Sequence, residues 1–222
     1  MRRFLALAVV LALATTAFGD QFYVKGAWNG WGLDDPMTFV AGVEHVATVT
    51  GLTPDDRPEY KCADEGWTKE APGSNGQFIV PASGEMTFHF YDQDSWSDGW
   101  EPSAKYRVGY DDPGNITWAV IGAMTSWSDV VMDDLGGGLW KKEMTLNAGN
   151  YNFKFRKEGD WDISIGDDFG DAAGDNWINV INDNELWAFE LDLPGGRWRA
   201  YYVPEPASLL LLGLGALVLR RR

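Results

Sequence analysis

An internal repeat constrains the fold of this chain more than any other feature of its sequence. The segment VKGAWNGW (24–31) returns as VIGAMTSW (120–127), and EYKCADEGW (59–67) returns as NFKFRKEGDW (152–161). In the same order, SNGQFIV (74–80) aligns with GDNWINV (174–180), and SGEMTFHFY (83–91) with GGRWRAYYV (195–203). Self-similarity of this kind indicates two copies of one structural unit. We therefore expect two domains with the same fold.

Alternating side chains within the repeats predict short β-strands. Tyr151, Phe153 and Phe155 alternate with polar residues, which is the period of two of a half-buried strand. Each repeat has the size of an immunoglobulin-like sandwich. The predicted fold class is therefore all-β, with two tandem immunoglobulin-like β-sandwich domains at 20–92 and 115–203.

A connector at 93–114 joins the two predicted domains. It is rich in Asp, Ser, Gly and Pro, but it also carries Trp96, Trp100, Tyr106 and Tyr110. A solvated spacer has few aromatic residues, so we expect the connector to pack against one domain or both. Tyr106 and Val108 fit an edge strand.

The first residues have the pattern of a secretory signal peptide. Two arginines precede the apolar run Phe4–Ala14, and Ala17 and Gly19 are the small residues of a cleavage site. We predict an N-terminal signal helix within 1–19 and a mature chain that starts near Asp20.

The last residues, 204–222, combine Pro204-Glu205-Pro206, an apolar run at 207–219 and three terminal arginines. The apolar run is shorter than the roughly 20 residues of a membrane-spanning helix. All three parts, in this order, closely resemble the PEP-CTERM sorting signal of exported bacterial proteins. The resemblance implies a short C-terminal hydrophobic helix that anchors the chain transiently in the inner membrane, cleavage by an exosortase, and delivery to the cell surface or the extracellular matrix. A plain C-terminal anchor is the alternative.

The net charge limits the kinds of molecule that the protein can bind. The chain has 33 acidic against 18 basic residues and a net charge of −15. Phosphate binding needs clustered Lys and Arg, so this acidity argues against nucleic acid, whereas a neutral polysaccharide remains compatible. Cys62 has no cysteine partner in the chain, and we expect it to be a small apolar core residue.

Four short motifs recur in both halves: G-A-[WM]-[NT]-x-W, an aromatic-Lys pair, E-G-(x)-W, and an Asn before an apolar strand. Together they resemble starch- and glycogen-binding modules, which are early-set immunoglobulin-like sandwiches. The resemblance implies that an α-glucan lies on two tryptophans while a lysine and an asparagine bond its hydroxyls. In the second half these positions are Trp127, Lys154, Trp161 and Asn176, with Asn179 as a rival; in the first half they are Trp31, Lys61, Trp67 and Asn75. We expect the site residues of the second half to face away from the core side of Phe153 and Phe155.

The leading hypothesis is an exported, non-catalytic protein that binds an α-glucan or exopolysaccharide. The alternative is a structural surface or matrix protein whose sandwiches bind no glycan. We expect no catalytic residues and no cofactor, because His45 and His89 lack a nucleophile motif and the many acidic residues single out no catalytic pair. No metal site is predicted, although calcium in the acidic loop 160–175 stays open because only the EF-hand spacing fails there.

Overall fold

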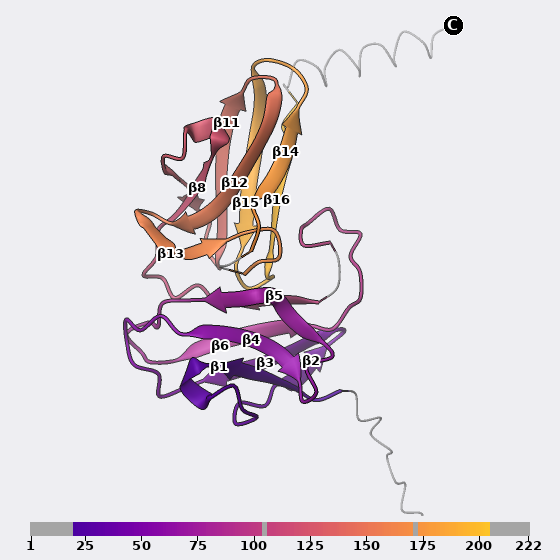
Figure 1. Cartoon of the computed structure of the whole chain (residues 1–222), viewed down its shortest axis with the longest axis vertical. Coiled ribbons are helices and arrows are strands. Elements are labelled where there is room, and N and C mark those ends of the chain that lie inside the picture. The colour runs from indigo at the N-terminus through magenta and orange to yellow at the C-terminus, as the bar shows by residue number, and fades with distance from the viewer. Residues whose placement is uncertain (1–19, 104–105, 171–172, 205–222) are drawn as a thin grey trace, which may run out of the picture.

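Four small antiparallel sheets make up the described part of the chain, residues 20–103, 106–170 and 173–204 of a computed structural model (Figure 1). The all-β prediction is confirmed. No sheet mixes strands from the two repeats: the earlier strands form the lower part of Figure 1 and the later strands the upper part. The predicted signal helix and C-terminal helix lie outside the described residues.

The first half contains two of these sheets. One has the order β1-β4-β5 and the other the order β2-β3-β6-β7. The strands are β1 (Phe22–Gly26), β2 (Thr38–Ala41), β3 (Glu44–Val49), β4 (Glu59–Asp64), β5 (Glu70–Gln77), β6 (Met86–Tyr91) and β7 (Arg107–Tyr110), with a short 3-10 helix η1 (Ala27–Asn29) after β1.

The second half repeats this plan. One sheet has the order β13-β12-β8-β9 with β14 also paired to β12, and the other has the order β10-β11-β15-β16. The strands are β8 (Trp118–Gly122), β9 (Val130–Val131), β10 (Asp133–Asp134), β11 (Leu139–Leu146), β12 (Gly149–Lys157), β13 (Asp160–Ile165), β14 (Asn176–Val180), β15 (Glu185–Asp192) and β16 (Arg197–Tyr202), and η2 (Ala123–Thr125) follows β8.

The sheet order corrects one part of the sequence alignment. β6 pairs with β3 and β7, as β15 pairs with β11 and β16. The counterpart of 83–91 is therefore β15, and the predicted match with 195–203 is wrong by one strand. The counterpart of β16 in the first half is β7, which comes from the connector and forms the edge strand expected around Val108. The sheet thus continues past residue 92 to Tyr110.

Aromatic side chains from the two sheets of each half contact each other. In the first half the ring centroids of Phe22 and Phe90 lie 4.4 Å apart, and in the second half those of Phe153 and Phe189 lie 5.1 Å apart. Each fully buried phenylalanine contributes about 1.5–3 kcal/mol of apolar stabilisation. Cys62 is buried in the first core with a free thiol, as expected.

The two halves also contact each other directly. The Arg57 guanidinium lies 2.8 Å from Asp160 and 3.0 Å from Asp162, and Asp168 accepts a hydrogen bond from the Ser74 backbone N–H at 2.6 Å. Glu101 of the connector forms a β-bridge with Trp198 of β16. The connector therefore packs against both halves, as its aromatic content predicted.

A glycine in β7 permits a further close contact between the halves. A Cβ atom at Gly109 would lie 2.1 Å from the Leu193 carbonyl oxygen and 2.3 Å from that of Pro194. We expect Gly109→Ala to lower the free energy of unfolding by about 2 kcal/mol, as overpacking does, because backbone on both sides must move. Urea denaturation measures the change. Gly66→Ala is the control, since its Cβ would meet only Thr68 at 3.7 Å; equal losses in the two variants would contradict the prediction.

Candidate functional site: two tryptophan pairs

The structure brings the two predicted tryptophans of each half together. The ring centroids of Trp127 and Trp161 lie 6.0 Å apart with an interplanar angle of 43°, and those of Trp31 and Trp67 lie 6.2 Å apart at 44°. We call Trp31 and Trp67 the first pair, and Trp127 and Trp161 the second pair. Each half thus builds the same aromatic geometry from two tryptophans that are separated in the sequence.

Turns at the ends of strands present these indoles to solvent. Trp31 and Trp127 follow η1 and η2, Trp67 lies in the turn between β4 and β5, and Trp161 is the second residue of β13. The exposed fractions are 40% for Trp67, 41% for Trp127 and 50% for Trp161, while Trp31 is half-buried. Each pair therefore offers indole surface that does not serve the core.

Three of the four tryptophans adopt a left-handed backbone conformation. The φ angles are 63° at Trp31, 59° at Trp67 and 59° at Trp127. Trp31 and Trp127 close the same turn, donating their N–H groups to the Gly26 and Gly122 carbonyls at 3.0 and 2.8 Å. A bulky residue in this region is a genuine outlier, and such strain of about 1–3 kcal/mol concentrates at functional sites. Glycine would fit these turns with less strain, so the indole side chain has a role that the turn itself does not require.

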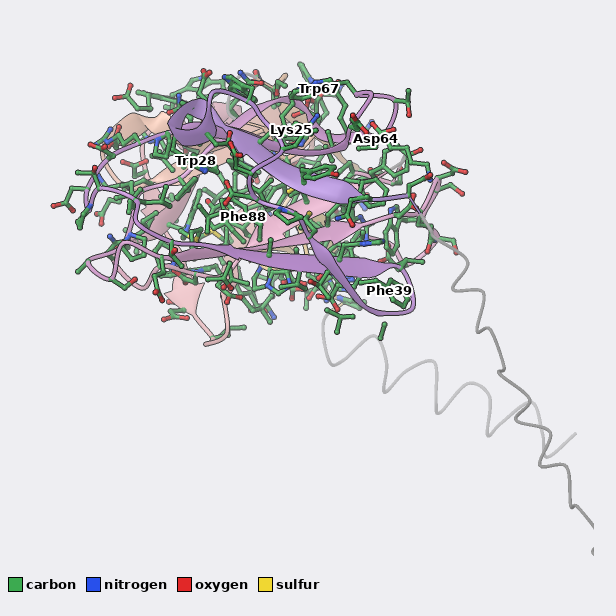
Figure 2. All side chains as sticks on the ribbon, turned by 90° about the horizontal axis from the view of Figure 1, so that it is seen from below. Lys25, Trp28, Phe39, Asp64, Trp67 and Phe88 are labelled. Atoms are coloured by element: carbon green, nitrogen blue, oxygen red, sulfur yellow. The ribbon has the colours of Figure 1, made fainter. Side chains whose placement is uncertain are left out.

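A cation covers the second indole of each pair. The Lys25 ammonium is buried and lies 4.0 Å from the Trp67 ring centroid; Figure 2 labels the two residues near each other in the first half. The Arg156 guanidinium carbon lies 4.2 Å from the Trp161 ring centroid. Burial lowers the pKa of Lys25, against the opposing effect of nearby carboxylates.

Arg156 is held in place by an aspartate. Its Nε and Nη2 donate to the two carboxylate oxygens of Asp129 at 2.7 and 2.8 Å, and this hydrogen bonding lowers the pKa of Asp129. The same carboxylate accepts the Gly159 N–H at 2.9 Å, in the turn before Trp161. The guanidinium is therefore fixed with one face on the indole.

Each of the two predicted lysines donates a hydrogen bond to a backbone carbonyl of its own half. Lys61 donates to the Gly73 carbonyl oxygen and Lys154 to the Ala173 carbonyl oxygen, each at 2.7 Å. Lys61 also lies 3.3 Å from the Glu70 carboxylate. Both lysines extend from the face opposite the core, as the alternation predicted, and each ammonium binds backbone that follows the second tryptophan: β5 in the first half and the loop before β14 in the second.

The expectation that Asn176 faces away from the core side is wrong. Its register partner on β12 is Phe153, so Asn176 faces the core side, and only 1% of it is exposed. Neither its amide nitrogen nor its amide oxygen has a hydrogen-bond partner among the described residues. Because successive strand residues alternate between faces, one residue of register decides the side. Asn179, its rival, is exposed on the outer face of the same strand.

Asn75, the asparagine predicted for the first half, does not occupy the position equivalent to Asn176. Tyr60, which aligns with Phe153, pairs with Gly76, so Gly76 and not Asn75 occupies the place of Asn176. The Asn75 amide instead donates to the Glu59 carboxylate at 3.0 Å. The structure therefore brings together two tryptophans in each half but not the predicted tetrad.

Sequence reasoning missed Lys25, Arg156 and Asp129. The repeat carried a signal for the first two, because each half has a cation where the other half has an apolar residue. Lys25 aligns with Ile121, and Arg156 aligns with Ala63. Nothing in the repeat indicated that Lys25 and Arg156 each lie over the second indole of their pair.

The described carboxylates of the acidic loop 160–175 do not lie together. Asp160 and Asp162 pair with Arg57, whereas Asp168 bonds Ser74. Among the residues placed by the structure, no group of three or more His, Cys, Asp or Glu side chains could hold a metal ion, and Asp171 lies outside them. The calcium alternative gains no geometric support from this part of the loop.

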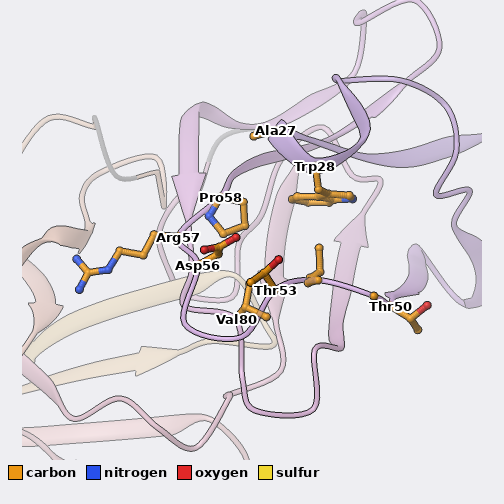
Figure 3. A pocket seen from close by; sticks show the side chains of 10 residues that line it. Ala27, Trp28, Thr50, Thr53, Asp56, Arg57, Pro58 and Val80 are labelled. Atoms are coloured by element: carbon orange, nitrogen blue, oxygen red, sulfur yellow. The ribbon is translucent and has the colours of Figure 1, made fainter.

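Two hollows of the surface lie away from the tryptophan pairs. A hollow of about 570 Å³ opens beside η1, where the Trp28 indole forms one wall and Arg57 points away (Figure 3). None of the predicted site residues lines it. Another, of about 410 Å³, is lined by Asn176, Trp177 and Trp198 among others. The tryptophan pairs are thus open surfaces, which suit a chain-like ligand better than a small enclosed one.

Comparison with known proteins identifies the end of the chain. Residues 203–222 match the PEP-CTERM protein-sorting motif. The protein is therefore exported and sorted to the cell surface by an exosortase, as the tail predicted. No curated protein matches the chain. Within residues 20–204, apart from the four that the structure leaves undescribed, no helix has the length and apolarity needed to cross a membrane.

Proposed function

We propose that this exported protein is a non-catalytic carbohydrate-binding protein built from two tandem immunoglobulin-like sandwich modules. Each module would present its tryptophan pair to an α-glucan or to another exopolysaccharide with a curved chain. The observation that carries the proposal is the recurrence of the pair. Centroid separations of 6.0 and 6.2 Å and angles of 43° and 44° arise from two segments that share only short motifs.

The geometry of a pair fits a sugar chain. One face of a pyranose ring is apolar and stacks on an indole, while its hydroxyls remain hydrated. In each pair the two indole planes are inclined to each other by about 44°. Consecutive residues of a curved glucan chain can rest on both planes, whereas a flat, extended chain can lie fully on only one of them. The net charge of −15 favours a neutral chain.

Each pair alone is expected to bind weakly. One aromatic contact adds about 0.5–1.5 kcal/mol beyond its buried area. Two modules on one chain can engage the same polysaccharide, so the second contact becomes intramolecular and raises the overall affinity.

A surface or matrix protein without a glycan ligand is the second candidate. The observations that favour it are the intramolecular bonds of Lys61 and Lys154 and the burial of Asn176. These three residues leave the indoles without the predicted hydroxyl partners. In this case the pairs would meet protein surfaces of the matrix.

Affinity electrophoresis in gels containing glycogen tests the proposal. We expect wild-type protein to be retarded, and Trp161→Ala to raise the apparent Kd by on the order of 10²-fold, because binding falls back on one module and the gain from tethering is lost. Trp177→Ala is the matched control, because Trp177 is 65% exposed and belongs to neither pair; its retardation should equal that of wild type. Cellulose-type β-glucan should retard all three less than glycogen. Identical mobility of wild type with and without glycogen would leave only the second candidate.

A further inference from the structure

The cations over Trp67 and Trp161 come from different strands. Lys25 belongs to β1, whereas Arg156 belongs to β12, the counterpart of β4. In the register of the first half, Lys25 pairs with Lys61 and Tyr23 pairs with Ala63. In the second half, Ile121 pairs with Lys154 and Ala119 pairs with Arg156.

The two cation positions are diagonal neighbours on one sheet face. Lys25 and Ala63 stand in this relation in the first half, as Ile121 and Arg156 do in the second half. Diagonal neighbours lie close enough for long side chains to reach the same point. In each half the residue without charge, Ala63 or Ile121, is fully buried. The cation has therefore changed strand between the repeats, but its distance from the second indole is the same within a few tenths of an ångström.

We infer that Lys25 and Arg156 are positioning residues, each holding the second indole of its pair by a cation–π contact on one face so that the other face stays set for a ligand. The inference rests on the proposed function for what the exposed face binds, but not for the positioning itself. Such a contact restrains a ring that stands in a turn (Trp67) or next to one (Trp161) and is about half exposed. A restrained ring loses less conformational freedom when a ligand binds, which is how preorganisation raises affinity.

The repeats supply their own substitutions for a test. Arg156→Ala installs the residue that the first half has at that position, and Ile121→Lys/Arg156→Ala rebuilds the first-half arrangement in the second half. Lys25→Ile and Lys25→Ile/Ala63→Arg are the reciprocal changes. The rescue variants separate the two roles of Arg156, because a lysine at position 121 restores the cation over the ring without the two-pronged pair to Asp129.

Positioning is measured without any ligand. Protein labelled with 5-fluorotryptophan gives a fluorine NMR resonance for Trp161, assigned by its absence in Trp161→Phe. We expect the Trp161 resonance to shift and change width in Arg156→Ala and to return toward wild type in Ile121→Lys/Arg156→Ala. The resonance of Trp67 should respond in the same way to Lys25→Ile and its rescue.

Binding is measured separately, by the retardation in glycogen gels. We expect Arg156→Ala to weaken binding about fivefold, the equivalent of one cation–π contact, with recovery in the rescue variant. An unchanged Trp161 resonance in Arg156→Ala, or a rescue variant that fails to restore it, overturns the inference. If the resonances behave as expected while wild type ignores glycogen, the proposed function fails and the positioning role stands.

Discussion

Removal of the second indole from both pairs is expected to abolish binding to glycogen. In Trp67→Ala/Trp161→Ala each module keeps one tryptophan, so neither retains the inclined pair. The loss should exceed that of either single variant, because a single variant still binds through its intact module. With each module weak on its own and the gain from tethering on the order of 10²-fold, the double variant should show no retardation in the gel.

The control for this variant removes a similar area of exposed aromatic surface elsewhere. Phe39 and Trp177 are 57% and 65% exposed and belong to neither pair. Phe39→Ala/Trp177→Ala should bind glycogen like wild type. Equal losses in the two double variants would mean that binding depends on general surface hydrophobicity, and that the pairs have no special role.

Asp98→Asn is expected to destabilise the fold strongly, because Asp98 is the ionic partner of a buried arginine. Arg107 of β7 is buried and donates to both carboxylate oxygens of Asp98 at 2.8 and 3.0 Å. Arg197 of the second half lies 3.2 Å from the same carboxylate. The variant replaces the anionic partner of Arg107 by a neutral amide whose single oxygen can accept only one of the two bonds, so we expect a loss of about 3 kcal/mol, at the lower end for a broken buried pair because Asp98 is partly solvated.

The effect of Asp98 should depend on pH with a defined sign. The hydrogen bonds from Arg107 hold the pKa of Asp98 at about 2, below its ordinary value of 3.8. A carboxylate with a lowered folded-state pKa stabilises the fold above its unfolded-state pKa, and this stabilisation is lost as the pH falls through the folded-state pKa. The difference between wild type and Asp98→Asn should therefore be full at pH 7 and shrink between about pH 4 and pH 2.

Urea denaturation at pH 7 and at about pH 2.5 measures both expectations. Asp34→Asn is the control, because Asp34 is exposed and belongs to none of the ion pairs named above. It should leave the urea midpoint of unfolding unchanged at either pH. A constant difference between wild type and Asp98→Asn across this range would show that the carboxylate charge contributes nothing to stability.

The sequence alone predicted the features that depend on local patterns. The alternation around Phe153 and Phe155 predicted a strand with one buried face, and β12 has it. The tail from Pro204 predicted the sorting motif that residues 203–222 match. The repeated G-A-x-x-x-W and E-G-W segments marked the four tryptophans that the structure brings together in pairs, because each tryptophan follows directly from a turn whose conformation is local.

The rest depended on contacts between distant parts of the chain. The face on which Asn176 lies was decided by its pairing with Phe153, since a shift of one residue in register reverses every side chain of a strand. The first half obtains its last strand, β7, from the connector, which no alignment of the repeats contained. Lys61 and Lys154 end at backbone carbonyls, of Gly73 in β5 and of Ala173 in the loop before β14, because these segments fold back over the sheet. The sequence by itself thus determined which residues stand at turns and strands; the tertiary structure decided which indoles are open and which cations lie behind them, because sheet register and loop path are set by long-range pairing and not by neighbours in the chain.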